Sequence, residues 1–204
     1  MQKKYSVGVV IPVYNEEKEL EENIKVLHRF LSNNLKDWKW KITIADNAST
    51  DNTLNIAQKL AKNVPEIQAL HLPQKGRGRA IKKAWQESKT DVVSYMDVDL
   101  STQLEHFPSL INSLKNKSFD IAIGSRLLTK SVVEKRTLKR EIISRCYNLL
   151  IRLIFFTKFS DAQCGFKATT RQVVDNLVPY ILDNEWFFDS ELLIVGEKIG
   201  RAHV

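Results

Sequence analysis

Apolar and polar residues follow one another along the first 124 residues in blocks that have the lengths of strands and helices. Ser6–Val13 is a continuous apolar, β-branched run, which indicates a strand buried on both faces. The next block, Glu16–Leu31, places its leucines and isoleucine at helical spacing. The same reasoning predicts further strands over Lys41–Ala45, Ile67–Leu72, Val92–Met96 and Asp120–Gly124, and further helices over Asn52–Ala61, Arg79–Ser88 and Leu104–Leu114.

This alternation predicts an α/β fold with a mainly parallel central sheet flanked by helices. The chain shows neither an internal repeat nor a linker, so we expect a single domain over residues 1–204. In open sheets of this kind, ligands bind beyond the carboxyl ends of the strands. The residues that directly follow each predicted strand are therefore the candidates for function.

Two aspartates, Asp97 and Asp99, follow the predicted strand Val92–Met96. In an extended segment, side chains two residues apart leave on the same side, and two carboxylates placed in this way repel unless a cation lies between them. Mg2+ or Mn2+ suits such a site, because these ions take a few carboxylate oxygens and complete their coordination with water and phosphate. Ser101 is available as a further ligand or as a helix cap. The alternative for the aspartates is an ordinary turn or helix cap.

Polar residues also follow the first two strands. Asp46 comes directly after Lys41–Ala45, where it could bind a base or ribose or, equally, cap the turn before the next helix. Tyr14 can stack on a base, and Glu16 can accept a hydrogen bond from a ribose or a base. The alternative for both is a loop that leads to a helix with acids in its first turn.

Gly76–Arg79 is a short segment of glycine and arginine in front of a predicted helix. Its second glycine is not followed by Lys-Ser or Lys-Thr, and a third glycine is missing, so it is neither a P-loop nor a dinucleotide fingerprint. ATPase and dehydrogenase functions are thereby disfavoured. The segment can hold a diphosphate at the helix N-terminus, or it can form a simple tight turn.

The composition is that of an ordinary globular chain, with 204 residues of which 43% are hydrophobic and 27% charged. It excludes a collagen, a coiled coil and a wholly disordered chain. No apolar stretch reaches the roughly 20 residues that span a bilayer. The two cysteines, Cys146 and Cys164, are too few for a disulfide framework or a structural zinc site, and they favour a reducing compartment.

The net charge of +7 is concentrated in residues 126–171, where eleven Lys and Arg stand against three Asp and Glu. Within this segment, Ile142–Phe159 is strongly apolar but carries Arg145, Arg152 and Lys158. Such a helix can lie at a membrane surface with its cations toward the lipid phosphates, and the alternative is a core helix whose cations reach solvent. We expect no nucleic-acid partner, because apolar residues rather than stacking aromatics fill the gaps between the cations.

Seven short blocks occur in order along nearly the whole chain. They are PVYNEE (Pro12–Glu17), ADNASTD (Ala45–Asp51), GRGRA (Gly76–Ala80), MDVDLST (Met96–Thr102), GSR (Gly124–Arg126), DAQCGFK (Asp161–Lys167) and WFFDSELL (Trp186–Leu193). This set resembles family 2 glycosyltransferases, and within them the dolichyl-phosphate glucose synthase-like branch. The resemblance implies a GT-A, Rossmann-like fold, a nucleotide-sugar donor, a divalent metal and a polyprenyl-phosphate acceptor.

The resemblance also implies roles for the residues in these blocks. The nucleotide-sugar donor would contact Pro12, Tyr14, Glu16, Asp46, Arg77, Asp97, Val98 and Asp99. The metal, Mg2+ or Mn2+, would be held by Asp97, Asp99 and Ser101, and catalysis would rest on Asp97, Asp99 and Arg126. Arg77 is a departure, since many relatives have lysine there, which keeps the charge but changes the geometry.

The implied reaction is a direct displacement at the anomeric carbon with inversion. An acceptor monophosphate has a second pKa of about 6, so it is largely dianionic near neutrality and needs no protein base, and we interpret all four histidines as structural or exposed. The candidate acceptor-binding residues are Arg126, Lys167, Arg171 and Asp189. The alternative for Lys167 and Arg171 is solvent exposure. Asp189 could instead support the site, or it could be a helix N-terminal charge.

We therefore predict transfer of a hexose, glucose from UDP-glucose, to a polyprenyl or dolichyl phosphate at the cytoplasmic face of a membrane. The alternatives are GDP-mannose as the donor, a non-lipid acceptor, and, from a different class, a non-catalytic membrane-surface module that keeps the fold. Asp97 and Asp99 count against the last.

We also expect a truncated C-terminus. Relatives of this branch usually continue beyond Trp186–Leu193 into a further strand and often a membrane-associated tail, so this chain would be peripheral or anchored by a missing segment. We interpret Ile199–Val204 as non-native, because a common library adaptor encodes these six residues in one frame.

Overall fold

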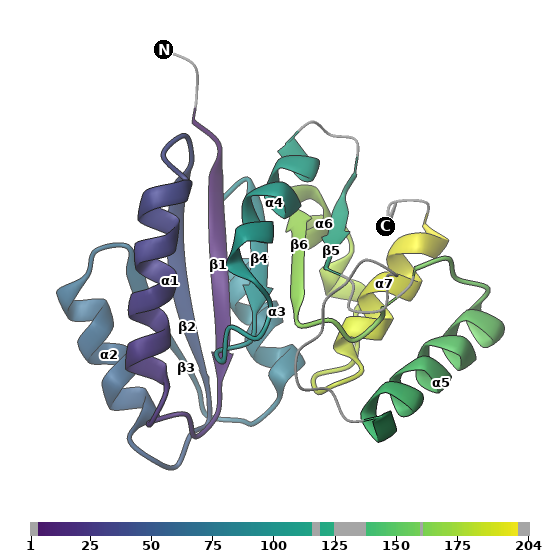
Figure 1. Ribbon diagram of the computed structural model, residues 1–204, viewed down its shortest axis with the longest axis horizontal. Helices are drawn as coiled ribbons and strands as arrows, with labels where there is room; N and C mark the ends of the chain where they lie inside the picture. Colours follow the sequence, from purple (N-terminus) through teal and green to yellow (C-terminus); the bar gives the residue numbers. More distant parts are fainter. Residues whose placement is uncertain (1–3, 116–118, 125–137, 160, 200–204) are drawn as a thin grey trace.

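The computed structural model describes residues 4–115, 119–124, 138–159 and 161–199 (Figure 1). Its strands are β1 (Ser6–Val13), β2 (Lys39–Asn47), β3 (Ile67–Leu72), β4 (Val92–Met96), β5 (Ile121–Ile123) and β6 (Phe166–Thr170). Its helices are α1 (Leu20–Asn34), α2 (Thr53–Asn63), α3 (Arg77–Glu87), α4 (Phe107–Lys115), α5 (Leu138–Phe155), α6 (Arg171–Asn176) and α7 (Phe188–Lys198), with 3-10 turns at η1 (Leu104–His106) and η2 (Val178–Tyr180). The predicted α/β fold is confirmed.

The strands form one sheet in the order β3-β2-β1-β4-β6-β5. The first four strands in this order run parallel, and β6 runs antiparallel to its two neighbours, β4 and β5. The sequence pattern did not predict β6, because Lys167 and three threonine or alanine residues interrupt its apolar character. Since Phe166 pairs with Met96, β6 begins beside the carboxyl end of β4.

The sheet separates two apolar cores. Val7, Val9 and Ile11 of β1 pack with buried residues of α1, α2 and α4 on one face, whereas Val10 packs with residues of α3, α6 and α7 on the other. This division follows from the pleat, which turns successive side chains to opposite faces. The continuous apolar run of β1 is therefore explained by burial on both faces, as predicted.

Several elements have bounds that differ from the prediction, and three of these differences bear on the candidate site. β2 extends to Asn47, so Asp46 lies inside the end of the strand rather than after it. α3 begins at Arg77 instead of Arg79, and α1 begins at Leu20 instead of Glu16. Asp46 and Arg77 thus belong to the ends of regular elements, where backbone hydrogen bonds fix the direction in which they leave the chain.

α5 lies at the margin of the molecule (Figure 1), and its described side chains are buried on one side only. Asn148 and Ile151 are buried, and the Tyr147 hydroxyl is hydrogen-bonded to the hydroxyl of Ser190 in α7 at 2.7 Å. Seven large apolar side chains in and just after α5 are exposed, namely Ile142, Ile143, Leu149, Leu150, Leu153, Ile154 and Phe156. α5 is therefore not a core helix. Within the part of the chain that the structure describes, every helix is too short or too polar to traverse a bilayer.

Candidate active site

Polar loops meet at the carboxyl edge of the parallel strands, and they are joined by hydrogen bonds. The backbone N–H of Asn15 donates to the Ser49 hydroxyl at 3.0 Å, and that of Glu16 donates to the Thr53 hydroxyl at 2.8 Å. Left-handed backbone conformations occur just after three of the strands, with φ of 56°, 60° and 49° at Asn15, Ala48 and Leu100. Residues other than glycine keep such conformations only where the surroundings hold them. The edge is therefore a defined surface rather than a set of independent loops.

Asp46 is completely buried, and its Oδ1 has no hydrogen-bond partner among the described residues. Its Oδ2 lies 2.7 Å from Nδ1 of His71, the residue directly opposite it in the β2–β3 register. The neighbouring Asn47 accepts a hydrogen bond from the backbone N–H of Gly76 at 2.6 Å, which ties β2 to the start of α3. Because an unpaired buried carboxylate oxygen is unfavourable, Asp46 Oδ1 is suited to accept a hydrogen bond from a ligand.

The sequence prediction did not include His71 in the site. The signal that identifies it is the parallel register of β2 and β3, which pairs His71 with Asp46. That register is known only from the structure, which shows how β2 and β3 pair. His71 therefore supports Asp46 instead of being a free surface histidine.

Three other predicted donor residues lie at or near this edge. Nζ of Lys75 is 3.8 Å from the centroid of the Tyr14 ring, so one face of the ring carries a cation. Pro12 is a half-buried residue of β1 that pairs with Ala45 of β2. Val98 is buried in the apolar core, so its side chain does not face the edge and only its backbone is left for a donor contact.

Glu16 lies near three other carboxylates, those of Glu19, Asp51 and Asp99. Partial burial raises the pKa of its carboxyl above the ordinary value, and repulsion from Glu19, Asp99 and Asp51 raises it further. An anionic ligand would be repelled by the same acids unless cations accompanied it. The acidic edge therefore favours the binding of a cation.

Asp97 and Asp99 are each held in place. Asp97 Oδ1 accepts a hydrogen bond from Arg77 Nη2 at 2.7 Å, and the backbone of Gly165 lies so close that a Cβ there would overlap the Asp97 carboxylate. Asp99 Oδ1 accepts a hydrogen bond from the backbone N–H of Ser101 at 3.0 Å. Among the described residues, no three or more His, Cys, Asp or Glu side chains gather in a way that would hold a metal. Two carboxylates nevertheless fit Mg2+ or Mn2+ when water and phosphate oxygens supply the other ligands.

Arg77 connects this edge to the interior. Nη1 donates to Asp189 Oδ2 and Nη2 to Asp97 Oδ1, each at 2.7 Å. The guanidinium carbon lies 5.0 Å from the centroid of the Tyr95 ring and 5.2 Å from that of Trp186. Burial acts to lower the pKa of Arg77, but Tyr95, Asp189 and Asp97 outweigh it and raise the pKa above its ordinary value. Arg77 is therefore a permanent positive charge with a fixed orientation.

The structure corrects the predicted acceptor-binding set. Lys167 is fully buried and its ammonium donates to protein oxygens, so it neither faces a phosphate nor lies in solvent. Asp189 is also buried, and it pairs with Arg77 and Lys167 instead of facing a substrate or acting only as a helix N-terminal charge. The placement of Arg171 is wrong, because its guanidinium donates to the Trp85 and Ser88 carbonyls at the opposite edge of the sheet. Arg126 lies outside the described residues.

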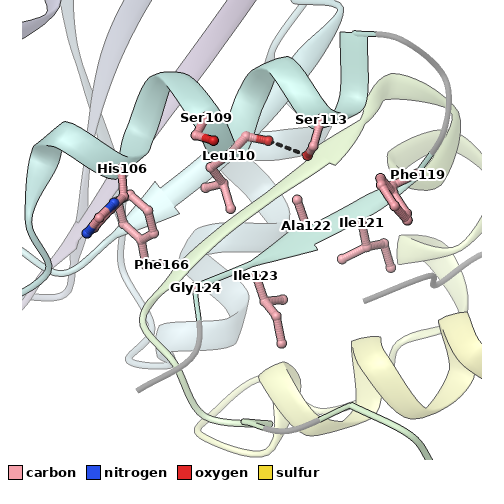
Figure 2. A pocket seen from close by; sticks show the side chains of 10 residues that line it. All are labelled: His106, Ser109, Leu110, Ser113, Phe119, Ile121, Ala122, Ile123, Gly124 and Phe166. Carbon is pink, nitrogen blue, oxygen red and sulfur yellow. Dashed lines mark hydrogen bonds between the residues drawn. The ribbon is translucent and has the colours of Figure 1, made fainter. Parts of the chain in front are cut away.

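A hollow of about 340 Å3 opens beside β5 and β6 (Figure 2). Its lining residues are His106, Ser109, Leu110, Ser113, Phe119, Ile121, Ala122, Ile123, Gly124 and Phe166. None of these described lining residues is Lys or Arg, so the hollow offers little to neutralise a phosphate. Its position beside Phe166 places it close to the end of β4.

The mainly parallel sheet, with acids and a fixed arginine at its carboxyl edge, defines an α/β protein with a candidate ligand site at the strand ends. The sequence profile of Glycosyl transferase family 2 matches residues 8–178, and the chain belongs to this family. The resemblance predicted from the seven blocks is thereby confirmed.

Curated relatives cover nearly all of this chain. Glycosyltransferase AglD of Haloferax volcanii is 34% identical over 195 residues, which are 95% of this chain and 31% of that protein. A dolichyl-phosphate beta-glucosyltransferase of Trichomonas vaginalis is 31% identical over 93% of this chain and 59% of its own length. The dolichol-phosphate mannosyltransferase of Pyrococcus furiosus is 34% identical over 84% of this chain and 48% of its own length. The chain thus spans less than two thirds of each of these relatives.

Solved structures share the fold. Glucosyl-3-phosphoglycerate synthase of Mycobacterium tuberculosis, solved with Mn2+, UDP-glucose and phosphoglyceric acid, matches with a TM-score of 0.68 and 20% identity. The match covers 97% of this chain and 66% of that one. The predicted GT-A fold is therefore confirmed.

Proposed function

We propose that this chain transfers a hexose, glucose from UDP-glucose, to a polyprenyl or dolichyl phosphate at a membrane surface, in a metal-dependent reaction that inverts the anomeric carbon. The observation that carries the proposal is the contact between Asp97 and Arg77 at the carboxyl edge of a family 2 chain. It combines a carboxylate suited to a divalent metal with a fixed cation, and both are what a diphosphate leaving group requires.

The donor side is supported by Asp46 and Tyr14. Asp46 Oδ1 is a buried acceptor suited to an N–H of the base or a ribose hydroxyl, and the Tyr14 ring offers a flat surface for stacking. Uracil and guanine both carry ring N–H groups, so these contacts do not choose between UDP and GDP. UDP-glucose is preferred because two of the relatives reported above carry glucosyl transfer or UDP-glucose in their names.

Mg2+ or Mn2+, when held by Asp97 and Asp99, supplies positive charge that neutralises the departing diphosphate. Arg77 adds a second, permanent charge beside Asp97. The dianionic acceptor phosphate attacks the anomeric carbon with one of its own oxygens, and the bond from that carbon to the diphosphate breaks in the same step. No proton needs to be removed by the protein, and a single displacement inverts the configuration. Arg126 stays the predicted ligand of the acceptor phosphate.

The membrane side is supported by α5. Its exposed apolar side chains, together with exposed Arg145, Arg152 and Lys158, suit insertion at the level of anionic headgroups. Cys146 is an exposed thiol, which fits the reducing environment on the cytoplasmic face. The proposal is therefore a protein that works at the cytoplasmic surface of a membrane.

The test is transfer of label into lipid. The protein is incubated with Mg2+ or Mn2+, labelled UDP-glucose or GDP-mannose, and polyprenyl phosphate, and label extracted into organic solvent is counted. The variant with Asp97→Asn and Asp99→Asn is the control. We expect extractable label from UDP-glucose that is absent in the variant. Label from GDP-mannose alone would correct the sugar, and metal-dependent UDP binding without any transfer would contradict the lipid acceptor.

A further inference from the structure

Four charged side chains of alternating sign run from the interior to the carboxyl edge. Lys167 Nζ lies 3.0 Å from Asp189 Oδ1, Asp189 Oδ2 lies 2.7 Å from Arg77 Nη1, and Arg77 Nη2 lies 2.7 Å from Asp97 Oδ1. The exposed fraction of these side chains rises along the series, from 0% and 4% to 11% and 41%. Only its outer end can therefore meet a ligand.

Lys167 is saturated by protein oxygens. Its ammonium donates to the carbonyls of Cys164 at 2.6 Å and Ala162 at 3.1 Å, to the Tyr95 hydroxyl at 3.2 Å, and to Asp189. A fully buried ammonium is retained only where such partners compensate for its lost hydration. Because every donor is used, Lys167 acts on the site through Asp189 and not through a substrate.

Asp189 has no free oxygen either. Oδ1 accepts from Lys167 and from the Tyr95 hydroxyl, which leaves Oδ2 for Arg77. Burial acts to raise the pKa of the Asp189 carboxyl, but Lys167 and Arg77 outweigh it and lower the pKa below its ordinary value. Asp189 is therefore an ionised anchor placed behind the arginine.

The backbone at Arg77 is fixed as well. The backbone N–H groups of Gly78 and Arg79 donate to the carbonyls of Glu185 and Asn184, at 3.1 and 2.9 Å. A Cβ at Gly78 would collide with Phe188 and with this same backbone, so α3 and the start of α7 are in close contact. With the adjacent backbone and Nη1 held, Nη2 of Arg77 is directed at Asp97 on the edge.

We infer that Lys167 and Asp189 are positioning residues that aim the outer nitrogen of Arg77 at Asp97 and at the diphosphate of the donor. The inference rests on the proposed function for the identity of that ligand. A planar fork suits this arrangement, because Nη1 and Nη2 of the guanidinium each contact a different carboxylate.

The test is a double-mutant cycle on UDP affinity, measured by calorimetry in the presence of Mn2+ and without acceptor. Asp189→Asn is expected to weaken UDP binding about tenfold, because Arg77 loses its anchor. In an Arg77→Gln background, Asp189→Asn is expected to cause no further loss, since it acts through Arg77. Arg171→Gln is the matched control, because that arginine is also partly buried but lies at the opposite edge. Losses that add in the double variant would overturn the inference.

Arg77→Lys serves as the second variant if Asp189→Asn does not fold, because it keeps the charge and removes only the fork. We expect it, too, to weaken UDP binding about tenfold, and affinity equal to that of the wild type would overturn the inference. The side-chain 15N resonances of Arg77 give a readout without ligand. They should be resolved in the wild type and averaged in Asp189→Asn, and averaging already in the wild type would overturn the inference. Failure of the folded wild type to bind UDP would instead overturn the proposed function.

Discussion

The donor side of the edge and the side formed by β6 and α7 use the same kinds of residue in opposite ways. On the proposed donor side, Asp46 has an oxygen without a hydrogen-bond partner among the described residues and Asp97 is 41% exposed, so each offers an acceptor to a ligand. On the other side, Lys167 and Asp189 satisfy each other in the interior. The difference teaches that a charged residue in a family block can serve a substrate or only its neighbours, and that the hydrogen bonds it already makes within the protein decide which.

The largest effect is expected at Asp97, the exposed end of the series of charged side chains that runs from Lys167 through Asp189 and Arg77. Asp97→Asn should lower the rate of transfer about 1000-fold, because the metal that neutralises the diphosphate would lose a carboxylate ligand, while the variant stays folded. The rate of label transfer measures it, and thermal unfolding checks the fold. The control is Asp37→Asn, an exposed aspartate just before the amino end of β2. Activity above a tenth of the wild type would contradict the assignment.

A substitution that leaves every charge in place tests the geometry alone. Gly165→Ala would push a methyl group into the Asp97 carboxylate, and we expect the rate to fall about 100-fold because the carboxylate must move. Gly8→Ala is the control, since a Cβ there would meet only side-chain atoms of Ser88 and Thr90. Equal rates in the two variants would show that the Gly165 contact is irrelevant.

The donor side can be probed through the partner that the sequence prediction lacked. His71→Ala should weaken UDP binding about tenfold, because Asp46 loses the hydrogen bond that orients it. His28→Ala is the matched control, as His28 makes a looser contact of 3.4 Å with Glu66 on the surface. Calorimetry with Mn2+ compares the two variants, and equal affinities would remove His71 from the site.

The exposed face of α5 predicts membrane binding. Leu150→Glu should reduce binding to vesicles that contain anionic lipid about tenfold, since it replaces an apolar contact with a charge. Val26→Glu makes the same kind of change on α1, at another exposed apolar residue, and should have no effect. Co-sedimentation measures both. Binding that does not change in Leu150→Glu would place the membrane contact elsewhere.

The smallest effect is a change in stability that comes from the carboxylates near Glu16. Because the pKa of Glu16 is raised in the folded chain, its ionisation destabilises the fold, and stability is lost as pH rises from the ordinary value of 4.5 through the folded pKa. Glu16→Gln should therefore raise the melting temperature at pH 7 by about 1–2 °C and leave it unchanged below pH 4. Glu22→Gln, on the exposed face of α1, is the control. A lower melting temperature at pH 7 would contradict this sign.

Much of the fold, and the position of the candidate donor residues at the strand ends, is predictable from the sequence, because both depend on local pattern. Apolar runs give β1, β3 and β4 with their correct bounds, and the residues that follow them include Asp97 and Asp99. The positions of Lys167 and Arg171 are not predictable in the same way, since they depend on which strand lies beside β4 and in which direction it runs. From the sequence alone, a basic residue in or beside β6 is indistinguishable from a surface cation, because its neighbours are set by the antiparallel pairing with β4.

The most direct test of the central claim is a crystal structure of this chain with UDP and Mn2+. The account predicts the base at Asp46 and Tyr14, the metal on Asp97 and Asp99, and the diphosphate beside Arg77. A nucleotide bound elsewhere, for example in the hollow beside β5 and β6, would contradict it.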